Sequence, residues 1–267
     1  MRAHDWPRYI ATQFAPEDKR ADLLTLYAFD AEIDRITRIA SDPMPGEIRL
    51  KWWSEVLHGE RSDEGASHPL AAALLKVIRN YPLPLEAFDR YLEAQAFAFY
   101  HDAFPDTVSL EGWCGETASA FLQMAAIVLD EKAANGAAEA AGHGGVALGI
   151  TGILQRLPQT RARGQCYLPQ DLLAACGLTR EGFVSGEDKE AMARASTALA
   201  ELGLGHAMKF RAHAKGLATS VRPAFLACAV TPLVLKRVAA HPAELHRAGV
   251  TVSRLREFAA IAFGAMR

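Results

Sequence analysis

Apolar residues recur at helical spacing through almost the whole chain, and this periodicity sets the fold class. Between residues 16 and 40 they recur three or four positions apart, which places them on one face of a helix. These residues are Leu23, Leu24, Tyr27, Ala28, Ile33 and Ile36. No run alternates between apolar and polar residues in the manner of a strand. The pattern therefore predicts an all-α protein.

Prolines, glycines and capping residues divide the chain into about nine or ten predicted helices with short connections, which favours one helical bundle over residues 1–267. Pro16 is expected at the first helical position, and Ser109 is expected to cap a later helix. The GHGG stretch at 142–145 indicates a break or a close helix contact, and without a preceding strand it is no phosphate loop. The predicted helices cover residues 16–40, 46–60, 68–81, 84–104, 109–129, 133–157, 189–217, 222–240 and 252–263.

Charge and cysteine usage exclude several classes of function. The formal net charge of the 267 residues is −2, and no Lys/Arg run marks a polyanion-binding tail, so we expect no nucleic-acid partner. The four cysteines stand far apart, without the spacing of a zinc site or a disulfide framework. Free thiols in a reducing compartment are the expectation.

The sequence predicts neither a signal peptide nor a membrane span. Acids and a proline interrupt the N-terminal stretch MRAHDWPRYIATQFAPEDKR, where a signal peptide needs an apolar core. Residues 223–240 come nearest to a span, but Thr231 and Pro232 interrupt the stretch and Lys236 and Arg237 close it. We expect a core helix there and a cytoplasmic protein, with docking on the inner face of a membrane left open.

Four sequence blocks occur in one order and at one spacing, and together they resemble the squalene/phytoene synthase family. The blocks are APEDKRADLLTLYAFDAEIDRI, GEIRLKWWSEVLHG, WCGETASAF and GVALGITGILQRLPQTRARGQCYLPQD, and the likeness covers residues 8 to 235. The resemblance implies the all-α isoprenoid-synthase fold with a central apolar cavity. It further implies head-to-head coupling of two prenyl diphosphates, with Mg²⁺ held by two aspartate-rich motifs. Mg²⁺ would neutralise the diphosphate leaving group and requires carboxylate oxygens.

The chain departs from the family at both aspartate-rich motifs. In the first motif Asp34 matches an acid, but Arg35 and Arg38 occupy the other two acidic positions. In the second motif no acid is left, because the acidic positions hold Arg156, Gln159 and Thr160. Each arginine reverses a unit charge beside the expected metal, and two unit charges about 4 Å apart interact by about 1 to 4 kcal/mol. We therefore expect no Mg²⁺ cluster and no other cofactor.

The acid-poor second block and GEIRLKWW look like the branch of this family that includes the mitochondrial complex I assembly factor. This narrower resemblance implies a non-catalytic assembly factor for a respiratory complex, with a respiratory-complex subunit as partner. A module that binds a prenyl lipid or prenyl diphosphate without converting it is also compatible with it.

The alternative is an active phytoene or squalene synthase that uses Mg²⁺. Asp30 and Asp34, one helical turn apart, could then share the metal ion, and Tyr27 and Tyr167 match family positions that line the cavity. Against this, Asp34 could pair with Arg35, Arg38 or another arginine. The sequence leaves the prenyl chain length, the partner and the oligomeric state undetermined.

Several other residues have both a functional and an ordinary interpretation. An anion pocket could form directly from arginines, and the settings of Arg20 and Arg163 match family positions near the diphosphate. Asp102 and Asp106 are expected at a solvated helix end, and His206 and His213 at the edge of the core because they lack a third ligand. The five arginines considered for the anion pocket are Arg20, Arg49, Arg156, Arg161 and Arg163.

Overall fold

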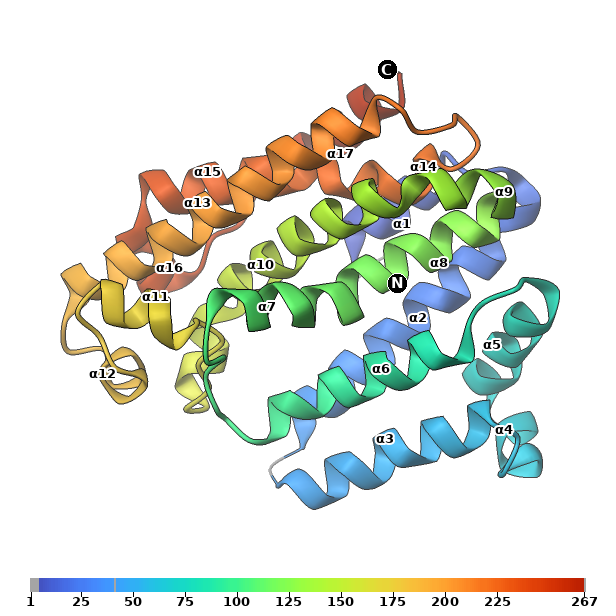
Figure 1. The fold of residues 1–267 in the computed structure, drawn as a ribbon, viewed down its shortest axis with the longest axis horizontal. Helices are drawn as coiled ribbons and strands as arrows, with labels where there is room; N and C mark the ends of the chain where they lie inside the picture. Colours follow the sequence, from blue (N-terminus) through green and yellow to red (C-terminus); the bar gives the residue numbers. More distant parts are fainter. Residues whose placement is uncertain (1–4, 41, 267) are drawn as a thin grey trace.

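The computed structural model describes residues 5–40 and 42–266, and every regular element in these ranges is a helix (Figure 1). The all-α prediction is confirmed. The predicted single domain stays a prediction, and it also includes residues 1–4, 41 and 267, which lie outside the described residues. The α-helices of the first half are α1 (Trp6–Thr12), α2 (Glu17–Ile39), α3 (Pro43–Leu57), α4 (Ser62–Ser67), α5 (Pro69–Asn80), α6 (Leu85–Ala96), α7 (Thr107–Cys114), α8 (Ala120–Leu129) and α9 (Glu131–Ala134). Those of the second half are α10 (Ala138–Ala162), α11 (Gln170–Ala175), α12 (Arg180–Ser185), α13 (Lys189–Ala214), α14 (Arg222–Phe225), α15 (Thr231–Ala240), α16 (Pro242–Ala248) and α17 (Arg254–Ala265).

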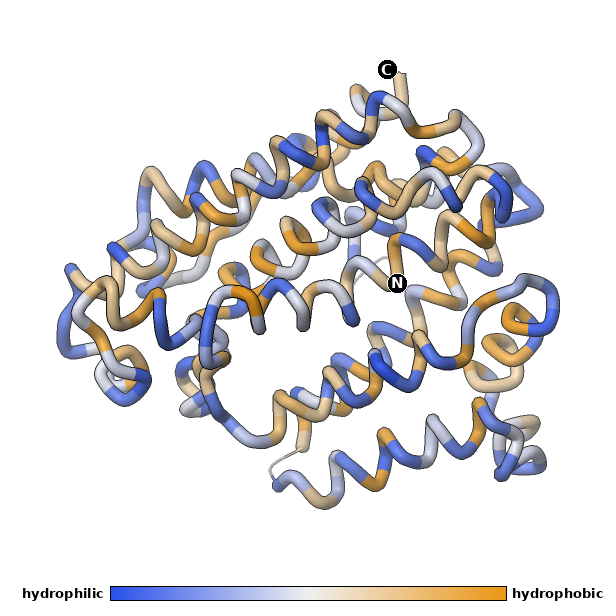
Figure 2. Tube along the Cα trace, viewed as in Figure 1, coloured by the Kyte–Doolittle hydropathy of each residue, from blue (hydrophilic) through white to orange (hydrophobic). Residues whose placement is uncertain are grey.

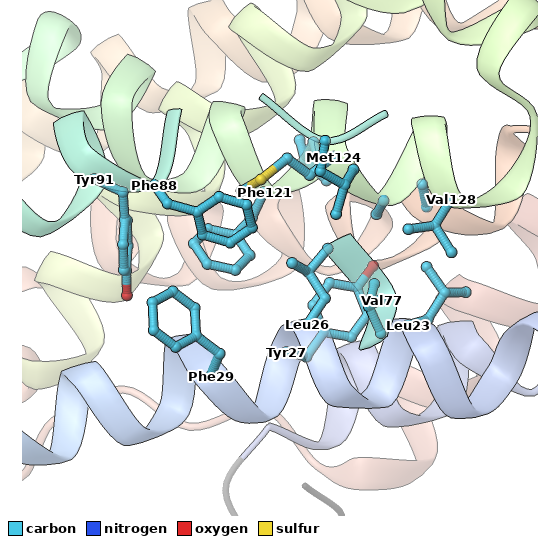
Figure 3. Packing of buried hydrophobic residues seen from close by; sticks show 14 of the residues in the cluster. Leu23, Leu26, Tyr27, Phe29, Val77, Phe88, Tyr91, Phe121, Met124 and Val128 are labelled. Atoms are coloured by element: carbon cyan, nitrogen blue, oxygen red, sulfur yellow. The ribbon is translucent and has the colours of Figure 1, made fainter. Parts of the chain in front are cut away.

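Helix α2 is the centre of the first core cluster. Leu26 and Phe29 are fully buried on it, and the Phe29 ring lies edge-on to Trp53 of α3 with 5.0 Å between centroids. Figure 3 shows the same face of α2 meeting Phe88 and Tyr91 of α6 and the side chains of α8. The periodicity located this helix correctly, although Leu26 and Phe29 are buried where Leu24 and Ala28 are only half-buried.

Helices α10 and α13 form the long antiparallel pair of the second cluster (Figure 1). The hydropathy colouring in Figure 2 shows hydrophobic and hydrophilic residues mixed along both helices. The GHGG stretch is no break, because α10 is continuous through it. A Cβ added at Gly145 would collide with the backbone of Ser119 in the π-helical segment η2 (Gly115–Ser119). The alternative prediction of a close helix contact is the one that the structure bears out.

Several predicted helix ends are wrong. Helix α3 begins at Pro43, three residues before Gly46, because proline needs no helical N–H partner in a first turn. Helix α7 begins at Thr107, two residues before the predicted start, since the carboxylate of Asp106 rather than Ser109 is the N-cap and accepts the Ser109 N–H at 2.7 Å. Pro158 lies inside α10, which continues to Ala162.

The remaining differences concern connections. The expected helix over 84–104 ends as α6 at Ala96 and is followed by the short 3-10 turn η1 (Phe97–Phe99). The two other 3-10 segments are η3 (Asn135–Ala137) and η4 (Leu226–Val230). Within the described residues, one helical stretch, Arg222–Ala240, is long and apolar enough to cross a membrane. However, 56% of its apolar stretch is buried inside the protein, as in the core helices of soluble proteins.

Candidate functional site

A cavity of about 610 Å³ is lined by residues of α1, α2, α7, η2, α10, η4 and α17, among others. Its wall is mixed rather than apolar throughout, which corrects the expected apolar lining. Trp113, Leu148 and Val230 provide an apolar part, whereas charged side chains gather where α2 faces α1 and α10. The charged lining residues are Asp5, Arg8, Asp30, Asp34, Arg38, Arg156 and Glu257.

Asp30 of α2 is already paired on both carboxylate oxygens. Its Oδ2 forms an ion pair with Nη1 of Arg8 from α1, and its Oδ1 accepts a hydrogen bond from the Tyr91 hydroxyl at 2.6 Å. The exposed fractions of the Arg8 and Asp30 side chains are 13% and 22%. Burial by itself lowers the pKa of Arg8, but the carboxylates of Asp30 and Asp5 together raise it above its ordinary value. Arg8 is therefore a permanent cation and the counter-charge of the Asp30 carboxylate.

Asp34, one turn further along α2, is held by two arginines. Its Oδ2 lies 3.0 Å from Nε of Arg38, and its Oδ1 lies 3.2 Å from Nη1 of Arg156, which reaches across from α10. The alternative in which Asp34 pairs with arginines is therefore the one observed. Both arginines occupy positions where the family carries acids, so the two altered motifs meet in one ion-pair cluster. Arg35 points elsewhere and pairs with Glu32 on the helix surface.

The other two positions of the second motif supply no carboxylate. Gln159 is exposed, and Thr160 is buried with its hydroxyl donating to the Arg156 carbonyl of its own helix at 3.2 Å. Gly149 and Gly152 line the cavity from the preceding turns. The α10 wall therefore presents a guanidinium, bare backbone and the uncharged side chains of Thr151 and Gln155 where a metal-binding wall would present acids.

Two of the five arginines considered for an anion pocket, Arg156 and Arg163, line one smaller pocket, and the other three lie apart from it. Neither Arg20 nor Arg49 lines the cavity. Arg20 donates to the Ala15 carbonyl at 2.9 Å, and Arg49 is exposed on α3. Arg163 lines a smaller pocket beside Asp34 and donates to the Arg38 carbonyl at 2.8 Å. Arg161 turns toward α13, with its Nη1 3.7 Å from the sulfur of Met192. The diphosphate-binding role of Arg20, Arg49 and Arg163 stays a prediction.

The two predicted tyrosines lie on different walls. Tyr27 lines the cavity beneath Arg8, whose guanidinium carbon lies 5.1 Å from the ring centroid, and burial raises the pKa of Tyr27. Tyr167 lines the smaller pocket and packs with Phe104 and Trp113 at centroid distances of 6.3 and 6.0 Å. Burial also raises the pKa of Tyr167. Both hydroxyls are therefore protonated at neutral pH.

The remaining predicted pairs separate. Asp102 is exposed in the connection between η1 and α7, whereas Asp106 caps α7, and the hydrogen bonds from Ser109 lower the Asp106 pKa. His206 is buried and His213 is exposed on α13. A third histidine, His143 of the GHGG stretch, lies between them in space.

The described residues of this cavity do not fit the Mg²⁺ that the family motifs imply. Mg²⁺ requires near-octahedral oxygen ligands about 2.0–2.1 Å away. Asp30 and Asp34 have all four oxygens engaged by guanidinium groups or a hydroxyl. Releasing them would leave Arg8, Arg38 and Arg156 beside the ion.

Sequence reasoning missed Arg8, Asp5 and Glu257. Glu257 of α17 is 9% exposed, and burial raises its pKa. Helices α1 and α17 are far apart in sequence and meet only in the folded chain, so no local pattern could identify their charged residues as cavity lining. Only the stretch DWPRYI, with a cation among apolar residues, carried a weak signal for Arg8.

Comparison with known proteins places nearly the whole chain in one family. A family model described as squalene/phytoene synthase matches residues 1–256. The NADH dehydrogenase (ubiquinone) complex I, assembly factor 6 of Bos taurus is 25% identical over 241 residues, which cover 89% of this chain and 71% of that protein. The presqualene diphosphate synthase of Rhodopseudomonas palustris is 27% identical over 176 residues, 64% of this chain and 61% of that one.

Solved structures share the fold. A dehydrosqualene synthase in complex with ligand has a TM-score of 0.78 at 17% identity and covers 99% of this chain and 92% of its own. The squalene synthase of Alicyclobacillus acidocaldarius has a TM-score of 0.72 at 19% identity, with 90% of each chain covered. At these identities the likeness establishes the all-α architecture and nothing finer.

Proposed function

Because the chain belongs to the squalene/phytoene synthase family, we propose that it is a member without prenyl-coupling activity that serves as an assembly factor for a respiratory NADH dehydrogenase. The relative from Bos taurus, named as a complex I assembly factor, supports the second half of this proposal. The cavity of the chain itself supports the first half.

The Asp34 cluster is the observation that carries the proposal. A prenyltransferase must place Mg²⁺ between carboxylates and a diphosphate, because diphosphate leaves only when its charge is neutralised. Here Arg38 and Arg156 occupy that place and hold Asp34 at 3.0 and 3.2 Å. With both of its oxygens paired to guanidinium groups, Asp34 offers a metal ion no unpaired oxygen.

The cavity is retained although the metal-binding carboxylates are not. Its volume of about 610 Å³ is in the range of small-molecule sites. Its apolar wall at Trp113, Leu148 and Val230 suits a prenyl chain, and we propose a prenyl lipid as an occupant that is bound and not converted. Such an occupant would be extracted from the purified protein by organic solvent and identified by mass spectrometry.

An activity assay tests the first half of the proposal. The purified protein is incubated with farnesyl and geranylgeranyl diphosphate in the presence of Mg²⁺, and released pyrophosphate and hydrocarbon products are measured beside an active dehydrosqualene synthase. We expect neither product above the level of a protein-free control. Pyrophosphate release accompanied by a coupled hydrocarbon would overturn the proposal.

A deletion strain tests the second half. We expect membranes from cells that lack the gene to lose NADH dehydrogenase activity, while succinate dehydrogenase activity, as the control, is kept. Complementation with the wild-type chain should restore the activity. Unchanged NADH dehydrogenase activity in the deletion strain would contradict the assembly role.

We further propose that the protein acts in the cytoplasm, peripherally on the inner face of the membrane. The exposed apolar side chains of Leu255, Phe258 and Met266 at α17 support this, with exposed fractions of 77%, 44% and 77%. In a flotation assay with liposomes, Leu255→Ser/Phe258→Ser should float less than the wild type. Equal flotation of both proteins would count against α17 as the contact.

A further inference from the structure

Three histidines and two acids converge between α10, α13 and α7, on the GHGG stretch that the cavity does not use. His143 of α10 lies with its Nδ1 3.1 Å from the Nδ1 of His206, and its ring centroid is 5.6 Å from that of His213. Glu139 lies one turn before His143 on the same helix face. His143 thus provides the third residue that the pair on α13 lacked in sequence.

The hydrogen bonds of this cluster fix the tautomer of His143. The Nε2 of His206 lies 3.3 Å from a carboxylate oxygen of Glu111. An ionised carboxylate only accepts, so Nε2 of His206 donates and its Nδ1 carries the lone pair. His143 must then donate its Nδ1–H to that lone pair. Its own Nε2 is therefore left with a free lone pair.

This relay has the form found behind metal-ligating histidines. Such a histidine donates its second ring N–H to a partner, which orients the ring and makes the other nitrogen a better ligand. Here the partner of His143 is His206, which is 7% exposed and is itself anchored by Glu111. Burial lowers the pKa of His143, and the nearby charge of Lys209 lowers it further.

We propose that Glu139, His143 and His213 bind a divalent transition-metal ion, with zinc the best match. The three ligand atoms, one from each side chain, lie within 4.8 Å of one another. Around a tetrahedral ion with bonds of about 2.1 Å, ligands stand about 3.4 Å apart. The side chains of Glu139 and His213 are both exposed, and their rotation would bring the ligand atoms to this spacing.

The ligand set selects the class of metal. Two imidazoles and one carboxylate favour zinc and its neighbours in the first transition row over Mg²⁺ or Ca²⁺, which prefer oxygen ligands alone. Three protein ligands leave a fourth position open to water or to a partner's side chain. The site also joins α10 to α13, so bound metal would stabilise the contact between the two longest helices of the second half.

Metal binding by the untagged, full-length protein tests the proposal directly. After equilibrium dialysis against Zn²⁺ alone, we expect one ion per chain and a thermal midpoint that rises with Zn²⁺. His143→Ala and His213→Ala should each lower zinc affinity more than 100-fold, because a ligand is lost. Glu111→Ala should lower it by about 10- to 100-fold, because only the relay is broken.

Matched controls separate this site from adventitious binding. His241→Ala removes an exposed histidine at the start of α16 and should keep the full affinity. Cys176→Ser removes the one half-buried thiol and should also keep it. Circular dichroism confirms that each variant is folded. Three results would each overturn the proposal. His143→Ala and His213→Ala could bind zinc as well as His241→Ala does, Cys176→Ser could lose its zinc, or the wild type could bind none.

Discussion

Replacing Arg8 with methionine tests the central ion pair of the cavity. Methionine keeps most of the apolar stem of the side chain but removes the guanidinium that lies over the Tyr27 ring. Asp30, only 22% exposed, then retains the Tyr91 hydroxyl as its one partner from this cluster. The variant therefore leaves a carboxylate in the fold without its counter-charge.

The expected cost follows from the burial of the pair. Removing one partner of a buried ion pair costs about 3–5 kcal/mol, because the other charge stays desolvated. Asp30 keeps a hydrogen bond from Tyr91 and is partly exposed, so we expect the lower end, about 3 kcal/mol. For a chain of this size that corresponds to a fall in Tm of about 6–12 °C.

Urea unfolding of a double-mutant cycle provides the assay. Asp30→Asn alone leaves Arg8 with Asp5 as its one remaining carboxylate partner from this cluster. Arg8→Met/Asp30→Asn removes both charges of the pair and keeps an acceptor for the Tyr91 hydroxyl. We expect the double variant to be more stable than the sum of the two single costs predicts, by at least about 1 kcal/mol. Strict additivity, or a cost below about 1 kcal/mol for Arg8→Met, would refute the reasoning.

The other predictions concern helix packing, the replaced acids and the buried acid of α17. Gly145→Ala should cost about 1–3 kcal/mol in urea unfolding, because its Cβ meets the backbone of the facing π-helical segment. The control Gly142→Ala, which has open space at the same helix, should gain about 0.5–1 kcal/mol, and equal effects would contradict the close contact. Arg38→Asp/Arg156→Asp should acquire an Mg²⁺-dependent rise in thermal midpoint that the wild type lacks, and its absence would show that more than these two charges was lost. Burial raises the pKa of Glu257, so the folded state binds its proton more tightly than the unfolded state and loses stability as pH rises through the folded pKa. Glu257→Gln should therefore have a higher free energy of unfolding than the wild type at neutral pH. Below the ordinary glutamate pKa range the two proteins should be equally stable, and urea unfolding at both pH values measures the difference.

The failures of sequence reasoning have a common physical origin. The start of a helix depends on which side chain accepts a hydrogen bond from the free N–H groups of the first turn. In α7 that side chain is Asp106 and not Ser109. His206 and His213 looked incomplete because His143 lies on another helix and reaches them only when α10 packs against α13. Residue spacing predicts which side chains are neighbours on one helix, but not which side chains of two different helices come into contact.

The sequence by itself determined the helical class, the family and the loss of acids at Arg35, Arg38 and Arg156, because periodicity and residue identity are properties of the chain alone. Only the tertiary structure decided what these changes do. In the folded chain Arg38 and Arg156 pair with Asp34, and Arg8 of α1 pairs with Asp30. Arg35 instead pairs with Glu32 on the helix surface. Charge pairing acts over a few ångströms in space, and the fold alone sets which charges come within that range.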